Sequence, residues 1–183
     1  RSAVEAFTSD VLFICSAGND ATNTDVVGHF PSGFDIPNLM AVAGSSPGRP
    51  LASYSNWGFH TIDLSAPGET IWSTFPGNQY KTMDGSSMAV PHVSGAAALL
   101  LSMEPDLSVQ EVKALLMDSA VHSPFLEGKV AAGGLLHIGR AVATLRPLVQ
   151  LFEEGETFDL EGYILHLRPA GRGFLGCAVR GLD

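Results

Sequence analysis

The sequence predicts an α/β domain with a mainly parallel β-sheet, followed by a small β-rich C-terminal extension. Two continuous apolar runs, Val11–Cys15 and Leu39–Ala43, are typical of strands that are buried on both faces of a parallel sheet. A long apolar segment, residues 87–103, is typical of a helix in the middle of such a domain. Alternation of apolar and polar residues between positions 158 and 167 predicts short strands near the C-terminus.

Composition supports a globular domain and excludes several classes of function. The chain has 183 residues, of which 45% are hydrophobic and 16% are charged, so it can bury roughly 70% of its unfolded surface. Ten Lys and Arg stand against 19 Asp and Glu, and the net charge of −9 argues against a nucleic-acid partner. No apolar run reaches the ~18 residues of a membrane span. Two cysteines, Cys15 and Cys177, cannot form a disulfide framework.

The remaining elements of the first half follow in order. Residues 1–9 have the apolar spacing of the end of a helix, and residues 18–38 are rich in loop-forming residues. Loops of this length in a compact domain are usually functional. Short strands are predicted at residues 62–64 and 71–75, and the second of these forms a hairpin with residues 80–83.

Three helices are expected in the second half. The long helix covers Ser87–Met103 and tolerates Pro91, which falls in or near its first turn. Ser108 and Glu111 have the spacing of a capping box, which predicts a second helix after Ser108. A last short helix is expected at Ile138–Leu145, ended by the Arg-Pro pair that follows.

The chain is expected to divide near residue 146. Residues 1–146 form the main domain, whereas residues 147–183 are too few to hold a core of their own. The role of this extension stays open between a β appendage of the main domain and the start of a further module.

Two places have residues suited to chemistry. Gly85-Ser86-Ser87 lies where a strand leads into a helix, and the helix dipole there would stabilise negative charge on a bound carbonyl group. Such a serine suits a nucleophile in acyl transfer, although a serine that only caps the helix has the same pattern. Asn19 follows the first buried strand, where its amide could donate to an oxyanion or could only form a turn.

The segment Gly85–Gly95 resembles the nucleophile motif of subtilisin-like serine proteases. The family motif is Gly-Thr-Ser-Met-Ala-x-Pro-His-Val-x-Gly, and this chain departs from it conservatively at Ser86, where the family has Thr. Ser16–Asn19 resembles the family's oxyanion segment. Other resembling segments occur in the family's order, at residues 30–32, 51–58, 63–68 and 133–138. The resemblance implies a three-layer sandwich, of which residues 1–146 would be the C-terminal half, so that the sheet is incomplete.

The resemblance also implies roles for individual residues. Ser87 would be the nucleophile, and Asn19 and the Ser87 backbone N–H would donate to the oxyanion. The residues expected to bind the substrate side chain before the scissile bond are Ser16, Ala17, Gly18 and, near the base of the pocket, His29.

The other two members of the catalytic triad are not found in this sequence. The family carries them in Asp-[Ser/Thr]-Gly and His-Gly-Thr segments, and none of the six histidines here is followed by Gly-Thr. His92 is not a substitute, because the helix carries it more than one turn from Ser87. We therefore expect the missing N-terminal half of the domain to supply both residues, and this chain alone to be inactive.

The expected function is a serine endopeptidase acting on polypeptides through an acyl-enzyme on Ser87. The chemistry requires no cofactor; a structural calcium is possible, and Asp63 resembles the place of a weak cation site, but no metal site is predicted. Family resemblance implies a secreted or extracellular protein. The alternative is a non-catalytic subtilase-like fragment that acts as a binding or structural module. An unrelated α/β hydrolase is disfavoured, because the sequence around Ser87 is not a Gly-x-Ser-x-Gly elbow.

Overall fold

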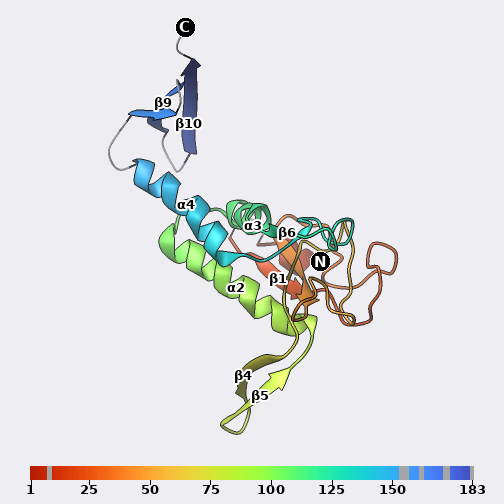
Figure 1. Cartoon of the computed structure of the whole chain (residues 1–183). Coiled ribbons are helices and arrows are strands. Elements are labelled where there is room, and N and C mark those ends of the chain that lie inside the picture. The colour runs from red at the N-terminus through yellow and green to blue at the C-terminus, as the bar shows by residue number, and fades with distance from the viewer. Residues whose placement is uncertain (8–9, 153–156, 161–162, 171–173, 182–183) are drawn as a thin grey trace. The chain divides into compact units, whose positions relative to one another are not determined.

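The structure, a computed structural model, describes the chain except for residues 8–9, 153–156, 161–162, 171–173 and 182–183. The chain divides into two compact units, Arg1–Ala141 and Val142–Asp183 (Figure 1). The first unit is a mixed α/β domain that contains the predicted site. The second is described by itself below.

The first unit contains both helices and strands. Its helices are α1 (Ser2–Glu5), α2 (Ser86–Met103), α3 (Val109–Asp118) and the start of α4 (Ile138–Phe152). Its strands are β1 (Phe13–Ser16), β2 (Leu39–Ser45), β3 (Leu64–Pro67), β4 (Ile71–Phe75), β5 (Gln79–Met83), β6 (Val121–His122) and β7 (Gly134–Leu135).

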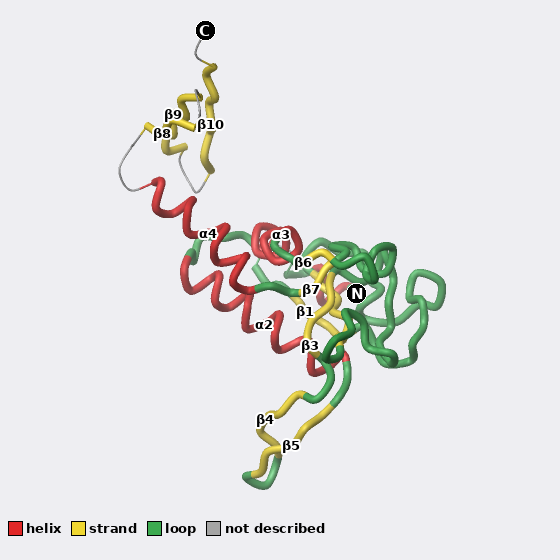
Figure 2. Tube along the Cα trace, viewed as in Figure 1, coloured by secondary structure: helices red, strands yellow, loops and turns green. Residues whose placement is uncertain are grey.

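Five of these strands form one sheet in the order β1-β2-β3-β7-β6. Helix α2 lies beside this sheet (Figure 2). Neighbours from β1 to β7 run parallel, and only β6 is antiparallel to β7. The mainly parallel sheet is therefore confirmed. β1 begins at Phe13 rather than Val11, and β3 begins at Leu64, where the predicted strand ends. The predicted burial of the first strand on both faces is wrong, because β1 is the end strand of the sheet and all its residues are only partly buried. The loops that follow β1 and β3 leave the sheet at the same edge, because parallel strands share their carboxyl ends.

Helix α2 packs against β1, β2, β3 and α3. Its buried side chains are small or branched, which allows the helix to lie close to the sheet; they are Ser86, Ala89, Val93, Ala96, Ala97 and Leu100. Sequence alone predicts burial all round, but Leu99 and Leu101 on this helix are 42% and 39% exposed. The described residues thus cover only one side of an apolar helix.

By length and composition alone, α2 would be long and apolar enough to cross a membrane. The core helix of a globular protein meets the same criterion, and this helix packs along a β-sheet. The criterion therefore gives only weak support for a membrane span.

The hydrophobic core on one face of the sheet gathers around β2. Ala41 and Ala43 contact a cluster that also includes Ile62, Leu126 and Val130. Since side chains alternate along a strand, the buried Met40 and Val42 point to the opposite face. All seven residues of β2 are buried, as expected for a central parallel strand.

An ion pair joins α3 to the sheet. Lys113 Nζ lies 2.8 Å from Asp63 Oδ1 and donates to the Leu39 carbonyl at 2.6 Å, while Asp63 Oδ2 accepts from Ala41 N–H at 2.7 Å. Cys15 lies near this pair. Burial, and secondarily the Asp63 charge, raise the pKa of its thiol to about 12, although Lys113 opposes the shift. Cys15 is therefore a neutral thiol at physiological pH.

Strands β4 and β5 form the predicted hairpin, which extends away from the sheet in Figure 1. The Trp72 and Tyr80 rings stack at 6.1 Å, and Lys81 Nζ lies 4.1 Å from the centre of the Phe75 ring. These cross-strand contacts hold together a ribbon whose side chains are mostly exposed.

The second unit contains an antiparallel sheet in the order β10-β9-β8, made of β8 (Thr157–Leu160), β9 (Tyr163–Ala170) and β10 (Phe174–Gly181).

The predicted end of the last helix at Leu145 is wrong, because α4 continues through Pro147 to Phe152. Apolar residues recur at helical spacing beyond the proline, so the periodic pattern outweighs the hydrogen bond that the proline removes.

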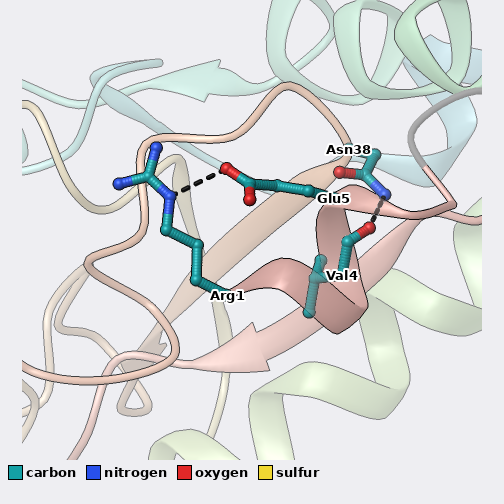
Figure 3. Close-up of polar contacts among 4 residues, drawn as sticks. All are labelled: Arg1, Val4, Glu5 and Asn38. Atoms are coloured by element: carbon teal, nitrogen blue, oxygen red, sulfur yellow. Dashed lines mark hydrogen bonds and ion pairs between the residues drawn. The ribbon is translucent and has the colours of Figure 1, made fainter.

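The buried side chain of Asn38 anchors the N-terminal segment to the sheet (Figure 3). Its Nδ2 donates to the carbonyls of Val4, Phe7 and Val11 at 3.0 to 3.2 Å. The Arg1–Glu5 ion pair in the same view is exposed and contributes little to stability. Asn38 therefore supplies the main polar contact between α1 and the start of β2.

We expect Asn38→Ala to lower the free energy of unfolding by about 1–3 kcal/mol, because buried carbonyls lose their donor. Asn38→Asp should cost more, since a carboxylate offers these carbonyls no donor when it is ionised. Chemical denaturation of the protein measures both, with Asn78→Asp in the exposed hairpin turn as the control. An Asn38→Asp variant as stable as the control would contradict this role.

Candidate active site

The end of β1 and the start of α2 meet through two hydrogen bonds. Asn19 lies three residues beyond β1, and its Oδ1 accepts from the backbone N–H of Ser86 at 2.9 Å and from the Ser86 hydroxyl at 2.9 Å. Ser86 is fully buried at the first position of the helix, whereas Asn19 is exposed. The structure therefore brings together two segments that lie 67 residues apart in sequence.

These two bonds set the orientation of the Asn19 amide. Because Oδ1 is engaged twice, Nδ2 is the part of the amide left to donate elsewhere. Nδ2 lies beside Gly85, only 3.3 Å from where a Cβ on Gly85 would stand. Gly85 also has a φ of 147°, which side-chain-bearing residues rarely adopt. A glycine at this position thus keeps the space next to the Asn19 donor open.

Ser87 lies in the first turn of α2 with its side chain exposed. Neither its hydroxyl nor its backbone N–H has a hydrogen-bond partner among the residues that the structure describes. The possible capping role is not observed, because α2 has no side-chain cap and Ser86 bonds to the Asn19 loop instead. Ser87 thus presents a hydroxyl and an amide donor at the positive end of a helix.

Asn56 holds the loop that carries Asn19, although it is not among the predicted site residues. Its buried Oδ1 accepts from the backbone N–H of Asp20 and Thr22, and its Nδ2 donates to the Ala17 carbonyl at 3.0 Å. Its own N–H donates to the Gly18 carbonyl at 3.0 Å. One buried residue thereby fixes both sides of Asn19. The signal in the sequence is its place in residues 51–58, one of the segments that resemble the family.

The four residues predicted to bind a substrate side chain lie together. Ser16, Ala17 and Gly18 are contiguous, and a Cβ on Gly18 would stand 2.7 Å from His29 Nε2 and 2.4 Å from Asn56 Nδ2. Gly18 also has a φ of 97°, so this close approach requires glycine. The half-buried His29 ring is held by a 2.7 Å hydrogen bond between its Nδ1 and Ser32 Oγ. The imidazole therefore lies directly against the segment that leads to Asn19.

None of the histidine rings that the structure describes is bonded to Ser87. The His92 ring bonds to the carbonyl of Met88 at 2.9 Å, one turn earlier on its own helix. His122 pairs with Glu127, and His137 Nδ1 accepts from the backbone of Arg140. His60 packs edge-on against Phe59, and the side chain of His166 lies outside the described part. A general base for Ser87 is thus not among these rings.

The described part of the chain holds no cluster of three or more metal-binding side chains. Asp63, which resembles the place of a weak cation site, has both carboxylate oxygens engaged, one by Lys113 and one by the Ala41 N–H. A cation bound there would have to displace the lysine. The geometry gives this position no support as a metal ligand.

Comparisons with known proteins identify the family of this chain. The sequence profile of the Subtilase family matches residues 1–150. The chain belongs to the subtilase family. It is 34% identical over 146 residues to subtilisin DY from Bacillus licheniformis, which covers 77% of this chain and 50% of that protein. An intracellular serine protease from Paenibacillus polymyxa is 37% identical over 145 residues, covering 73% of this chain and 42% of that protein.

Solved structures show the same fold. The subtilase cytotoxin SubAB assembly contains a chain that matches 85% of this one with a TM-score of 0.72 at 22% identity, over 56% of its own length. The subtilase described here spans about half the length of the bacterial relatives it matches. Since the name of one relative places it inside the cell, family membership does not fix the compartment.

Ser86 offers a direct test of how this site is held. We expect Ser86→Ala to destabilise the protein by about 1–3 kcal/mol, because Gly18 N–H loses the acceptor that Ser86 Oγ provides at 3.1 Å. Ser86→Thr keeps a hydroxyl and should stay within about 1 kcal/mol of the parent, a value of the size of one hydrogen bond. Thermal denaturation compares the two. Equal stability of the alanine and threonine variants would show that the hydroxyl does not hold the loop.

Proposed function

We propose that the protein containing this chain is a serine endopeptidase in which Ser87 is the nucleophile. The supporting observation is the geometry at Asn19: Ser86 engages its carbonyl oxygen, and neither Asn19 Nδ2 nor the Ser87 N–H has a hydrogen-bond partner among the described residues. Two such donors, one in the turn that carries the serine and one in the loop bonded to that turn, are what an acyl-transfer site needs. Family membership supports the same reaction class.

In this reaction Ser87 Oγ attacks the carbonyl carbon of the scissile peptide bond and gives its proton to a histidine base. The carbonyl oxygen becomes negative and accepts hydrogen bonds from Asn19 Nδ2 and the Ser87 N–H. The protonated histidine then donates to the leaving amine, and an acyl-enzyme remains on Ser87. Water attacks this ester through the same base and the same two donors, which releases the acid and restores the serine. The chemistry requires no cofactor.

The substrate is a polypeptide, and the residues around Gly18 hold the side chain that precedes the scissile bond. Gly18 has no side chain of its own to fill this space, and His29 lies against it with its orientation set by Ser32. In this proposal Ser16, Ala17 and Gly18 form one wall, and His29 shapes its base.

The triad Asp and His come from a further segment of the same domain. Two features of the described residues support such a partner. β1 is the end strand of the five-stranded sheet and pairs on one side only, with β2. Beside it an apolar groove of about 470 Å³ lies between residues 10–14 and helices α2 and α3. An added strand next to β1 with an apolar side toward α2 would cover both surfaces.

A non-catalytic binding module is the second candidate, and one observation favours it: no described histidine ring is bonded to Ser87. The two candidates differ in the reactivity of one hydroxyl. A fluorophosphonate probe labels an activated serine, so labelling of Ser87 in the full-length protein supports the peptidase. An unlabelled Ser87 in the folded protein supports the binding module.

Ser87→Ala is expected to abolish peptide hydrolysis by the full-length protein, since no other group replaces the nucleophile. Asn19→Ala is expected to lower turnover about 10²–10³-fold, the loss measured in subtilisin for one oxyanion donor. Hydrolysis of a peptide substrate measures both, with Ser102→Ala, an exposed position of the same helix outside the groove, as the control. Activity retained by the Ser87→Ala variant would rule out this assignment.

Substitutions on α2 test whether a further segment covers the groove. Leu101 lines the groove and Ser102 does not, although both side chains are exposed in this chain. Leu101→Glu should lower the thermal midpoint of the full-length protein by several degrees, because a charge would be buried against the added segment. Ser102→Glu on the same helix is the matched control. Equal midpoints for the two variants would show that the groove stays open to solvent.

A further inference from the structure

Tyr54 connects the two loops that the proposed reaction uses. Its backbone carbonyl accepts from Ala21 N–H at 2.9 Å, two residues after Asn19. Its hydroxyl donates to the Gly68 carbonyl at 2.7 Å and accepts from Gly85 N–H at 3.1 Å. A single residue therefore contacts the loop that carries the Asn19 donor and the turn that carries Ser87.

The hydroxyl of Tyr54 lies where three stretches of backbone come together. A Cβ on Gly44 would stand 3.1 Å from the hydroxyl oxygen, and one on Gly68 would stand 3.2 Å from it. The same Cβ on Gly68 would also lie 2.9 Å from the Gly85 carbonyl oxygen. Since these glycines have no side chains, the phenol is the side-chain group that links them.

The hydrogen bonds at this point are shared. Gly85 N–H also donates directly to the Gly68 carbonyl at 2.7 Å, so it has two acceptors, and the carbonyl has two donors. Loss of the hydroxyl leaves the direct bond between Gly85 and Gly68 in place. The fold should therefore survive, whereas the hydrogen bond between Gly85 N–H and the Tyr54 hydroxyl is lost.

Ser86 holds the same turn from its other side through Asn19. Gly85 thus lies between two anchors, one at Ser86 and one at Tyr54. The two oxyanion donors, Asn19 Nδ2 and Ser87 N–H, belong to the two connected segments. A change in the distance between the segments would change the distance between the donors.

We propose that Tyr54 is a positioning residue, whose hydroxyl sets the spacing between the Ser87 turn and the Asn19 loop and hence the spacing of the oxyanion donors. The inference rests on the proposed peptidase function. Tyr54 touches no reacting atom in this proposal and acts through Gly85.

The state of the phenol fits this role. Burial raises the pKa of Tyr54, and the charges of Glu69 and Asp84 add to the shift, while the bond from Gly85 N–H opposes it. The hydroxyl therefore remains protonated and able to donate to Gly68 through neutral and mildly alkaline pH.

The test is Tyr54→Phe in the full-length enzyme, with Tyr80→Phe as a matched control. Tyr80 loses the same atom from the exposed hairpin, where its ring stacks on Trp72. For Tyr54→Phe we expect kcat to fall about 3–10-fold with KM changed less than about 2-fold, because sub-ångström displacement affects mainly the transition state. Tyr80→Phe should leave both constants unchanged.

Two further measurements keep the result decisive. Titration of active sites with a fluorophosphonate gives the concentration of folded enzyme, to which kcat is normalised. If the loss of activity in Tyr54→Phe disappears after this normalisation, it came only from misfolding and the proposal is overturned. A normalised kcat within about 2-fold of the parent, or a rise in KM alone, also overturns it. Ser87→Ala distinguishes failure of the peptidase proposal from failure of the role of Tyr54. If Ser87→Ala stays active, the peptidase proposal fails. If Ser87→Ala is inactive while Tyr54→Phe is normal, only the role of Tyr54 fails.

Discussion

The contact between Asn19 and Ser86 is the constraint on which the candidate site depends. Two hydrogen bonds to one amide oxygen join the carboxyl end of a sheet strand to the amino end of the central helix. Without them, the exposed Asn19 amide could rotate and present either its oxygen or its nitrogen. With them, Asn19 Nδ2 is the remaining donor, and it lies beside Gly85, directly before the first turn of α2. The candidate site therefore forms only where the loop after β1 contacts the start of α2, and neither segment contains it alone.

Much of the surrounding structure maintains this meeting. Parallel pairing of β1, β2 and β3 brings the loops after β1 and β3 to one edge of the sheet. Asn56 fixes the loop after β1 from within, and Gly18 and Gly85 allow the backbone to approach without side chains in the way. At the opposite end of the domain, Asn38 and the Lys113–Asp63 pair hold α1 and α3 to the sheet. Polar contacts with defined geometry complement an apolar core that is largely non-directional.

The sequence predicts the parts of this molecule that depend on local pattern. The strands β1 and β2, the β4–β5 hairpin and the capping box at Ser108 are all found close to their predicted positions, although only β2 is buried as predicted. The prediction fails where a local rule competes with a longer pattern, as at Pro147 inside α4. Asn56 and Tyr54 are not predicted as site residues, because their importance comes from partners 14 to 39 positions away. No periodicity records such contacts.

The exposed apolar side of α2 shows how a sequence pattern and this structure can both be right. The pattern predicts a helix that is buried all round, and the described residues bury one side only. A helix does not carry Leu99 and Leu101 toward water without cost, since each partly exposed leucine forgoes a part of the roughly 1.5–3 kcal/mol that full burial provides. In the first turn of the same helix, Ser87 bonds to none of the histidine rings that the structure describes. In the proposed function, one covering segment would supply both apolar contact and a base, because the apolar surface and the Ser87 hydroxyl belong to one helix.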